Sequence, residues 1–157
     1  MENKELVGKA LGKVASGLYV VTSKNGNDLV GFTASFLVQV AFEPPIVAVS
    51  MKKGRASFDA IMSRKEFVVN IMTKDTMKLV GAFANPKNET PFDGVAMTEK
   101  TLGLPVLTDS LAYLECKVHS TSEVGDHVVV FGEIVNGDLL KEDGEPATHV
   151  RKNGFSY

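Results

Sequence analysis

The stretch GFTASFLVQVAFEPPIVAVSM, residues 31–51, contains two extended apolar segments that a Pro-Pro pair separates. Small and hydroxyl side chains stand together in the first segment, at Thr33, Ala34 and Ser35. Short side chains on a strand leave the backbone N–H and C=O groups within reach of a flat ligand. Residues 52–57, KKGRAS, then supply cations, a glycine and a hydroxyl where a helix is predicted to begin. A ring over the first part and an anion over the second would suit a phosphorylated aromatic cofactor.

Length and composition limit the class of protein. The chain has 157 residues, which predicts a single domain over residues 1–157. Its hydrophobic content of 44% and its charged content of 23% are typical of a globular protein with a real core. The net charge of −2 provides no basic surplus, so we expect neither nucleic acid nor an anionic membrane as a partner.

Cysteine usage and the lack of long apolar runs indicate the compartment. Cys116 is the one cysteine, so an internal disulfide is impossible and a reducing compartment is expected. The first residues lack the apolar core of a secretory signal, and no apolar run approaches the ~20 residues that cross a bilayer. These features predict a cytoplasmic protein.

Hydrophobic periodicity predicts a mainly β chain with a few short helices. Residues 4–15 place their apolar side chains on one helical face, and Asn25-Gly26 carries the signal of a tight hairpin. Residues 18–23 and 66–72 are apolar on both faces, so helices or a second subunit should cover them. Further strands are predicted over residues 29–39, 47–51, 112–121 and 127–140, and further helices over residues 56–64 and 76–84. Strands that hairpins connect, with few helices, indicate an antiparallel barrel with helical caps.

Three local features refine this picture. Asp75 is predicted to cap the helix over residues 76–84. Residues 85–105 are rich in Pro, Gly, Asn and Asp, which predicts a long irregular loop that either functions or covers a partner. Gly132 inside the last strand predicts a bulge or a close contact with a neighbour.

Residues 33–35 and 52–57 each have a functional and a structural interpretation. Residues 52–57 can form an anion site, because Arg55 can contact phosphate oxygens with two N–H groups and a helix start points N–H groups outward. A solvated basic turn explains the same residues, and short motifs often match by chance. Thr33, Ala34 and Ser35 fit either a ligand wall or the tight packing of a bent barrel strand. The residues alone leave both questions open.

His127 and Cys116 are the other side chains that could take part in chemistry. His127 follows Gly125-Asp126 at a strand start, where it can hydrogen-bond a cofactor or move a proton, although a surface turn histidine is commoner. Cys116 lies on the predicted inward face of its strand, which favours a buried and inert thiol. No spacing of His, Cys and Asp suits a metal site, and neither a nucleophile elbow nor a Gly-rich dinucleotide motif occurs.

Six segments, taken in order, resemble the flavin reductase-like family. No single one decides the matter, but together they extend over most of the chain, from about residue 11 to residue 140. The most similar branch comprises flavoredoxins and the flavin reductase module of high-molecular-weight rubredoxins and flavodiiron proteins. The segments are GLYVVTS (17–23), GFTASF (31–36), EPPIVAVS (43–50), FVVNI (67–71), LAYLEC (111–116) and GDHVVVFGEI (125–134).

The resemblance implies an FMN-binding split β-barrel of the antiparallel Greek-key type. It implies a homodimer with FMN bound noncovalently near the subunit interface. It also implies that His127 lies near the flavin as the catalytic residue, with a role in nicotinamide binding or hydride transfer. The cofactor-binding residues expected on this basis are Thr33, Ala34, Ser35, Phe36 and Ser50 around the flavin, and Lys52, Arg55 and Ser57 at its phosphate.

Two features depart from the family pattern. Many relatives carry two serines after Thr-Ala, where this chain has Ser35-Phe36. Flavoredoxin-like relatives have a longer tail that reaches over the site, so residues 149–157 are not expected to contact it. Whether FMN is a prosthetic group or a substrate stays open.

The implied function is the transfer of electrons from NADH or NADPH through FMN, since the cofactor carries this chemistry and the protein positions it. The acceptor would be free flavin, a metal centre, or a redox protein of the rubredoxin or flavodiiron type. One alternative is an FMN-containing electron carrier without its own nicotinamide site. Another is a split-barrel dimer that has lost its flavin.

Overall fold

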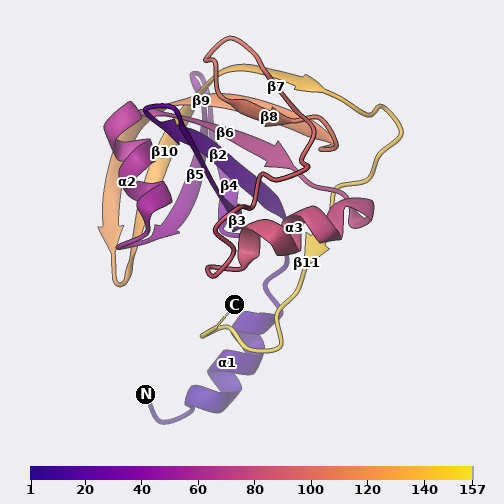
Figure 1. Cartoon of the computed structure of the whole chain (residues 1–157). Helices are drawn as coiled ribbons and strands as arrows, with labels where there is room; N and C mark the ends of the chain where they lie inside the picture. Colours follow the sequence, from indigo (N-terminus) through magenta and orange to yellow (C-terminus); the bar gives the residue numbers. More distant parts are fainter. Residues whose placement is uncertain (157) are drawn as a thin grey trace.

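An antiparallel sheet of seven strands forms the body of the protein, which a computed structural model describes over residues 1–156 (Figure 1). Across the sheet the strands follow the order β3-β2-β6-β9-β10-β5-β4. The prediction of a mainly β, antiparallel fold with a few short helices is confirmed. The strands are β2 (Tyr19–Asn25), β3 (Asp28–Ala34), β4 (Leu37–Phe42), β5 (Pro45–Lys52), β6 (Glu66–Ile71), β9 (Ala112–Val124) and β10 (His127–Leu139).

The sheet curls around an apolar core, because alternate side chains of each strand point to the same side. Val21, Val49, Phe67, Val69 and Val130 come from four strands and are inaccessible to solvent. Burying one such side chain contributes about 1.5–3 kcal/mol to folding. The end strand β3 also contacts β5, so the two ends of the sheet approach each other.

The single strand predicted over residues 29–39 is wrong, because the chain changes its pairing partner at Ser35 and Phe36. β3 pairs with β2, whereas β4 pairs with β5 at the other end of the sheet. The Phe36 carbonyl accepts a hydrogen bond from Ser50 N–H at 2.9 Å, where the second pairing begins. Local periodicity does not reveal the change, because both strands are similarly apolar. The consequence is that residues 33–36 cross from one end of the sheet to the other.

Local signals predicted the first hairpin and one helix correctly. Asn25 pairs with Asp28 at the tip of the β2–β3 hairpin, with Gly26 at a φ of 60°. α2 extends over Ala56–Arg64, as predicted. α3 (Met77–Ala84) follows a short 3-10 turn, η1 (Lys74–Thr76). The predicted cap Asp75 is wrong, because the hydroxyl of Thr76 exchanges hydrogen bonds with the backbone of Thr73 instead.

α1 (Lys4–Gly12) and the C-terminal segment lie outside the barrel, below it in Figure 1. Two short strands, β1 (Ser16–Gly17) and β11 (Thr148–His149), pair where these segments meet the barrel. The carbonyls of Gly8 and Gly12 accept hydrogen bonds from Gly154 and Arg151 N–H at 2.7 and 3.0 Å. The tail therefore covers the glycine face of α1. The apolar face that periodicity predicted for residues 4–15 is largely exposed instead.

The chain itself covers the outer faces that were expected to need helices or a second subunit. Val20 of β2 packs with Val80 and Phe83 of α3. Val68 of β6 packs with Leu104 and Val106, which lie at the end of the long loop and in the strand that follows it. These two faces therefore need no second subunit.

The segment predicted as a long irregular loop covers the sheet. It includes one short strand, β7 (Met97–Glu99), which pairs with β8 (Pro105–Leu107). Glu115 of β9 holds the loop in place, because its buried carboxylate accepts hydrogen bonds from Thr101 N–H at 3.2 Å and Leu102 N–H at 2.8 Å. A third donor, the side-chain amide of Asn136, reaches the same carboxylate at 2.7 Å. The loop therefore covers a face of the chain's own sheet, whereas the sequence predicted that it would either function or cover a partner.

Two predictions for the last strands are also confirmed. The pairing of β9 and β10 shifts register next to Gly132, and a Cβ at Gly132 would collide with the ring of Phe67. Cys116 is buried, and burial, with the neighbouring Glu115 carboxylate, raises the pKa of its thiol to about 12. The thiol is therefore protonated and inert at neutral pH. Among residues 1–156, no helix is long and apolar enough to cross a membrane.

Candidate functional site

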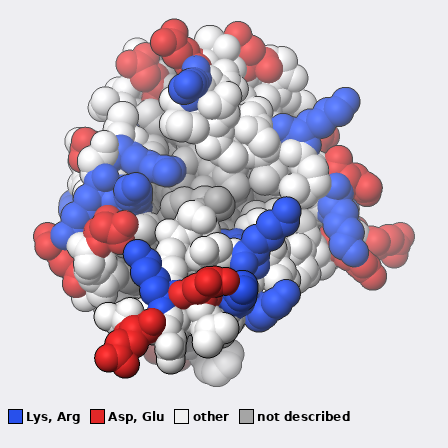
Figure 2. Space-filling model, turned by 90° about the horizontal axis from the view of Figure 1, so that it is seen from below, with Lys and Arg blue, Asp and Glu red and all other residues white. Residues whose placement is uncertain are grey.

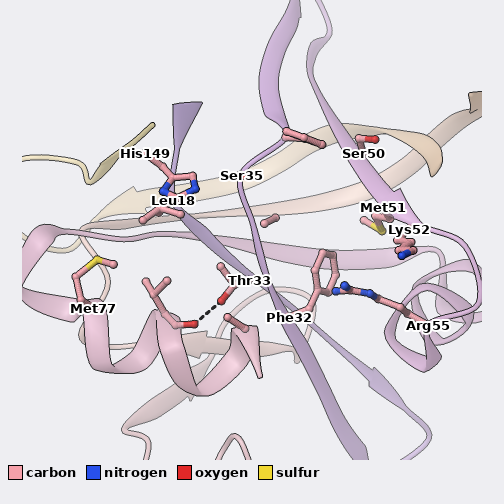
Figure 3. Close-up of a pocket in the computed structure, with 14 residues that line it drawn as sticks. Leu18, Phe32, Thr33, Ser35, Ser50, Met51, Lys52, Arg55, Met77 and His149 are labelled. Atoms are coloured by element: carbon pink, nitrogen blue, oxygen red, sulfur yellow. Dashed lines mark hydrogen bonds between the residues drawn. The ribbon is translucent and has the colours of Figure 1, made fainter. Parts of the chain in front are cut away.

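A cavity of about 260 Å³ opens between β3, β5, α3 and β11 (Figure 3). It contains much of the site that the sequence predicted, because the crossing at residues 33–36 brings the first segment beside the end of β5. The predicted residues that line it are Thr33, Ala34, Ser35, Phe36, Ser50, Lys52 and Arg55. Its other lining residues are Leu18, Phe32, Met51, Met77, Val80, Ala84 and His149.

Thr33, Ala34 and Ser35 form one wall, but their side chains have different tasks. The Thr33 hydroxyl donates to the Val80 carbonyl at 2.6 Å, so it holds α3 against β3 (Figure 3). Ala34 and Ser35 are largely buried, and within residues 1–156 the Ser35 hydroxyl forms no hydrogen bond, and its oxygen stays accessible to solvent. A ligand in the cavity can therefore supply a hydrogen-bond partner, whereas Thr33 contributes mainly its backbone and methyl group.

Lys52 and Arg55 supply positive charge at one end of the cavity, and Met77 and His149 lie at the other (Figure 3). Neither Lys52 nor Arg55 forms an ion pair or a side-chain hydrogen bond with any residue from 1 to 156. Lys53, between them, points elsewhere and pairs with Glu123 at 2.9 Å. Lys52 adds to the effect of His127 in lowering the pKa of Asp126, but neither cation is ion-paired within residues 1–156. Cations placed in this way next to a helix start are suited to bind a phosphate.

Ser57, the third residue predicted at the phosphate, does not line this cavity. It lies in the first turn of α2 and lines a neighbouring cavity of about 380 Å³, which shares Phe32, Arg55 and Ala84 with the first. Ser57 is thus close to Arg55 in the chain but faces different space. The role predicted for Ser57 at the phosphate stays a prediction, and the sequence did not show this division between two cavities.

His127, the predicted catalytic residue, stands behind the cavity wall and does not line the cavity. Its ring centroid lies 6.1 Å from that of Phe36, which does line it. The His127 side chain is 14% exposed, and its Nδ1 lies 2.7 Å from a carboxylate oxygen of Asp126. This hydrogen bond lowers the pKa of Asp126. The pair orients the imidazole, and the contact with Phe36 connects it to the cavity.

The C-terminal segment contacts the site, so the expectation that residues 149–157 would not is wrong. His149 of β11 lines the cavity opposite the cations. The guanidinium carbon of Arg151 lies 4.8 Å from the centroid of the Phe36 ring. The pairing of β11 with β1 places both residues here, and a two-residue bridge of that kind leaves no periodicity in a sequence.

Sequence reasoning also missed the apolar walls that Leu18, Met77 and Val80 provide. The signal was present, because α3 was predicted as a helix beside an apolar strand. The sequence did not show that α3 packs on β3, because this packing depends on the contact between Thr33 and Val80, which are 47 positions apart. Together with Phe32 and Met51, these side chains form surroundings in which an aromatic ring can be buried.

Residues 11–156 match the family model described as "Flavin reductase like domain". The chain belongs to the flavin reductase-like family. Diflavin flavoprotein A 1 of Synechocystis sp. is 36% identical over 152 residues, which are 95% of this chain and 26% of that relative. The chain thus spans about a quarter of the length of the curated relatives it matches.

Solved structures of the family share the fold. Nitrilotriacetate monooxygenase component B of Mycobacterium thermoresistibile superposes with a TM-score of 0.89 at 26% identity, over 96% of this chain and 84% of that one. Flavin reductase PheA2 superposes with a TM-score of 0.82 at 28% identity, over 96% and 94%. Flavin reductase HpaC, solved with NADP+, superposes with a TM-score of 0.84 at 27% identity, over 94% of both chains. This chain therefore has the mainly β, antiparallel fold of the flavin reductase-like family that its sequence resembles.

Proposed function

We propose that this chain binds FMN in the cavity and that NADH or NADPH reduces it there. The observation that carries the proposal is the cavity, with apolar walls along its length and, at one end, Lys52 and Arg55, which form no ion pair within residues 1–156. That division matches FMN, which has an apolar ring system at one end and a phosphate at the other. The flavin, when bound, supplies a ring that accepts hydride from the nicotinamide.

The residues of the chain have separate roles in this proposal. Lys52 and Arg55 hold the phosphate, with charge-assisted hydrogen bonds that a neutral donor does not match. The Ser35 hydroxyl gains the hydrogen-bond partner that the protein does not supply. Phe32, Met51 and Val80 exclude water from the ring. His127, held by Asp126, sets the position of Phe36 in the cavity wall, against which a nicotinamide would lie.

Electrons then leave for an acceptor that we infer to be a redox protein of the rubredoxin or flavodiiron type. The support is the group of relatives named diflavin flavoproteins, in which the segment matching this chain is about a quarter of the whole. On the face seen from below, acidic and basic side chains of the described residues lie interspersed, so these residues offer an acceptor no extended patch of one charge (Figure 2). Free flavin is the simplest other acceptor.

We further propose that two copies of the chain associate through β4 and its neighbours. Val38 and Val40 project from this end strand and are 60% and 50% exposed. Val38 lies opposite Ala48 of β5, and Ser50, two residues on along the same face, lines the cavity. A second copy on this surface would therefore reach the edge of the flavin site.

Two measurements test the proposed function. Purified protein should show flavin absorbance, or gain it with added FMN, and denaturation should release FMN into the supernatant. The FMN-loaded protein should then oxidise NADH or NADPH under air. Binding without oxidation would identify an electron carrier that lacks a nicotinamide site. Failure to bind any flavin would refute the proposal.

A further inference from the structure

The C-terminal segment brings two side chains to the proposed flavin site, and the function proposed so far gives His149 no role. His149 lines the cavity at the end away from the two cations (Figure 3). The guanidinium carbon of Arg151 lies 4.8 Å from the centroid of the Phe36 ring. Thr148 and Val150, which alternate with them, are exposed. An extended backbone therefore turns every second side chain of this segment toward the site.

Backbone hydrogen bonds on both sides of His149 hold it in place. Ala147 N–H donates to the Met72 carbonyl at 2.8 Å, and Arg151 N–H donates to the Gly12 carbonyl at 3.0 Å. The imidazole therefore extends from a fixed backbone. A contact between this ring and a ligand costs little ordering, because the segment that carries the ring is already in position.

The sheet register brings Ser35 to the same part of the site. Tyr19 at the start of β2 pairs with Ala34 at the end of β3. Ser16, three residues before Tyr19, pairs with His149. Ser35 follows Ala34 directly and lines the same cavity as His149. Both side chains are thus delivered where β2 begins and β3 ends.

Ser35 and His149 have hydrogen-bonding capacity that the protein does not use. Within residues 1–156, neither the Ser35 hydroxyl nor the His149 imidazole forms a hydrogen bond or an ion pair. Ser35 is largely buried and His149 is half-buried, and the neighbouring lining residues Leu18 and Met77 are apolar. A polar group in such surroundings costs free energy until it gains a partner.

The ring system of a flavin has one polar edge that suits these two groups. Its pyrimidine ring carries two carbonyl oxygens and an N–H group, whereas the opposite edge carries two methyl groups. The pyrimidine edge satisfies both Ser35 and His149, and the methyl edge would leave both without partners. The free side chains therefore favour one orientation of the ring in the cavity.

We propose that His149 donates a hydrogen bond to the pyrimidine edge of the bound flavin and stabilises the reduced flavin. The inference rests on the proposed function and adds a residue that sets the reduction potential. Hydride transfer moves two electrons and one proton from NADH or NADPH to the flavin. The reduced ring thus has one more negative charge until it takes up a second proton from water. That charge is spread over the pyrimidine part, and an N–H donor binds an anion more strongly than a neutral acceptor.

Reduction potentials of the FMN-loaded protein, measured against a reference dye without oxygen, test this. His149→Leu removes the N–H donor and should weaken binding of reduced FMN about tenfold more than that of oxidised FMN. For a two-electron couple this lowers the potential by about 30 mV. His149→Gln retains a donor and should lower it less. His119→Leu is the matched control, since His119 is exposed and lines neither this cavity nor its neighbour, and it should leave the potential unchanged.

A second comparison serves if His149→Leu does not retain FMN. His149→Glu and His149→Gln have side chains of the same shape, but near neutral pH the carboxylate repels the charge of the reduced ring. The glutamate variant should therefore have the lower potential, and equal potentials in this pair would overturn the inference.

Other outcomes separate this inference from the proposed function. If His149→Leu binds both redox forms of FMN less tightly to the same extent, the potential is unchanged and His149 only shapes the cavity, so the inference is wrong while the flavin site stands. If the potential is unchanged and KM for NADH rises, His149 contacts the nicotinamide and the assignment to the flavin is overturned. If the unchanged protein does not bind FMN, the proposed function itself fails.

Discussion

Arg55 and Lys53 are cations two positions apart, yet the structure gives them different surroundings. Arg55 lines the proposed flavin cavity without an ion-pair partner among residues 1–156, while Lys53 pairs with Glu123. Charge in the sequence is therefore a weak guide to an anion site. The side chain that has no partner is the one available to a phosphate.

Arg55→Ala should weaken FMN binding about tenfold, equivalent to ~1.4 kcal/mol, because one charge-assisted contact at an exposed site is lost. Riboflavin, which lacks the phosphate, should bind as before. Fluorescence titration with both ligands measures the difference. Lys53→Ala is the control and should change neither affinity. Equal weakening for FMN and riboflavin would show that Arg55 does not contact the phosphate.

We expect His127 to assist reduction of the flavin by nicotinamide. It would do so by positioning Phe36 and not by holding the flavin. His127→Asn should slow anaerobic reduction by NADH or NADPH about tenfold to a thousandfold, because a positioning contact is lost. FMN affinity should stay unchanged. Unaltered reduction rates, or a parallel loss of FMN affinity, would assign His127 a structural role.

Asp126 provides the pH readout for this residue. Its hydrogen bond with His127 lowers its pKa, so the carboxylate form is favoured in the folded protein. The contribution of the pair is therefore complete above the ordinary pKa of an aspartate and is lost as pH falls through the lowered one. Stopped-flow reduction of Asp126→Asn should be slower than that of the unchanged protein near neutral pH.

At the scale of elements, glycines decide how closely strands and helices approach. Gly132 of β10 lies against the ring of Phe67, which is fully buried. Gly81 of α3 faces open space, with no atom within 4 Å of a Cβ placed there. The same residue type is thus required at one position and replaceable at the other.

Gly132→Ala should destabilise the protein by about 1–3 kcal/mol, because the added methyl overpacks the core. Gly81→Ala, the matched change, should instead stabilise it by about 0.5–1 kcal/mol, because alanine favours a helix interior. Urea unfolding followed by circular dichroism measures both. A Gly132→Ala protein as stable as the unchanged one would mean that the contact with Phe67 relaxes freely.

At the scale of the whole molecule, the end strand β4 exposes apolar side chains that a partner would cover. The expectation of a dimer first rested on residues 18–23 and 66–72, which the chain covers with its own α3 and loop. The exposed apolar side chains lie elsewhere, on β4, where Phe42 is 87% exposed beside Val38 and Val40. A strand edge of this composition is normally paired or covered.

Light scattering at micromolar concentration should therefore give twice the 16.9 kDa mass of one chain. Val38→Arg combined with Val40→Arg should shift the protein to a monomer, because two charges would be buried at the interface. Val135→Arg, which changes a valine on β10 that is 42% exposed, is the control and should leave the dimer intact. A monomer with flavin bound in the unchanged protein would refute the dimer.

The sequence by itself determined the features that depend on neighbouring residues. The Asn25-Gly26 hairpin, α2, the alternation of β9 that buries Cys116, and the close approach at Gly132 all follow from local conformational preference and period. It also indicated most residues of the candidate site, because Thr33 to Phe36 and Ser50 to Arg55 form two short segments whose composition is unusual for a core.

Only the tertiary structure decided how those segments meet. The break at Ser35-Phe36, the hydrogen bond from Thr33 to Val80, and the return of His149 to the cavity each join residues far apart in the chain. Periodicity indicates which face of a helix or strand is apolar. It does not indicate which other element of the chain packs on that face, because many elements have a matching apolar face. For the same reason the sequence did not show which face of α1 is exposed. The C-terminal segment packs on the glycine face of this helix, and that contact joins the two ends of the chain.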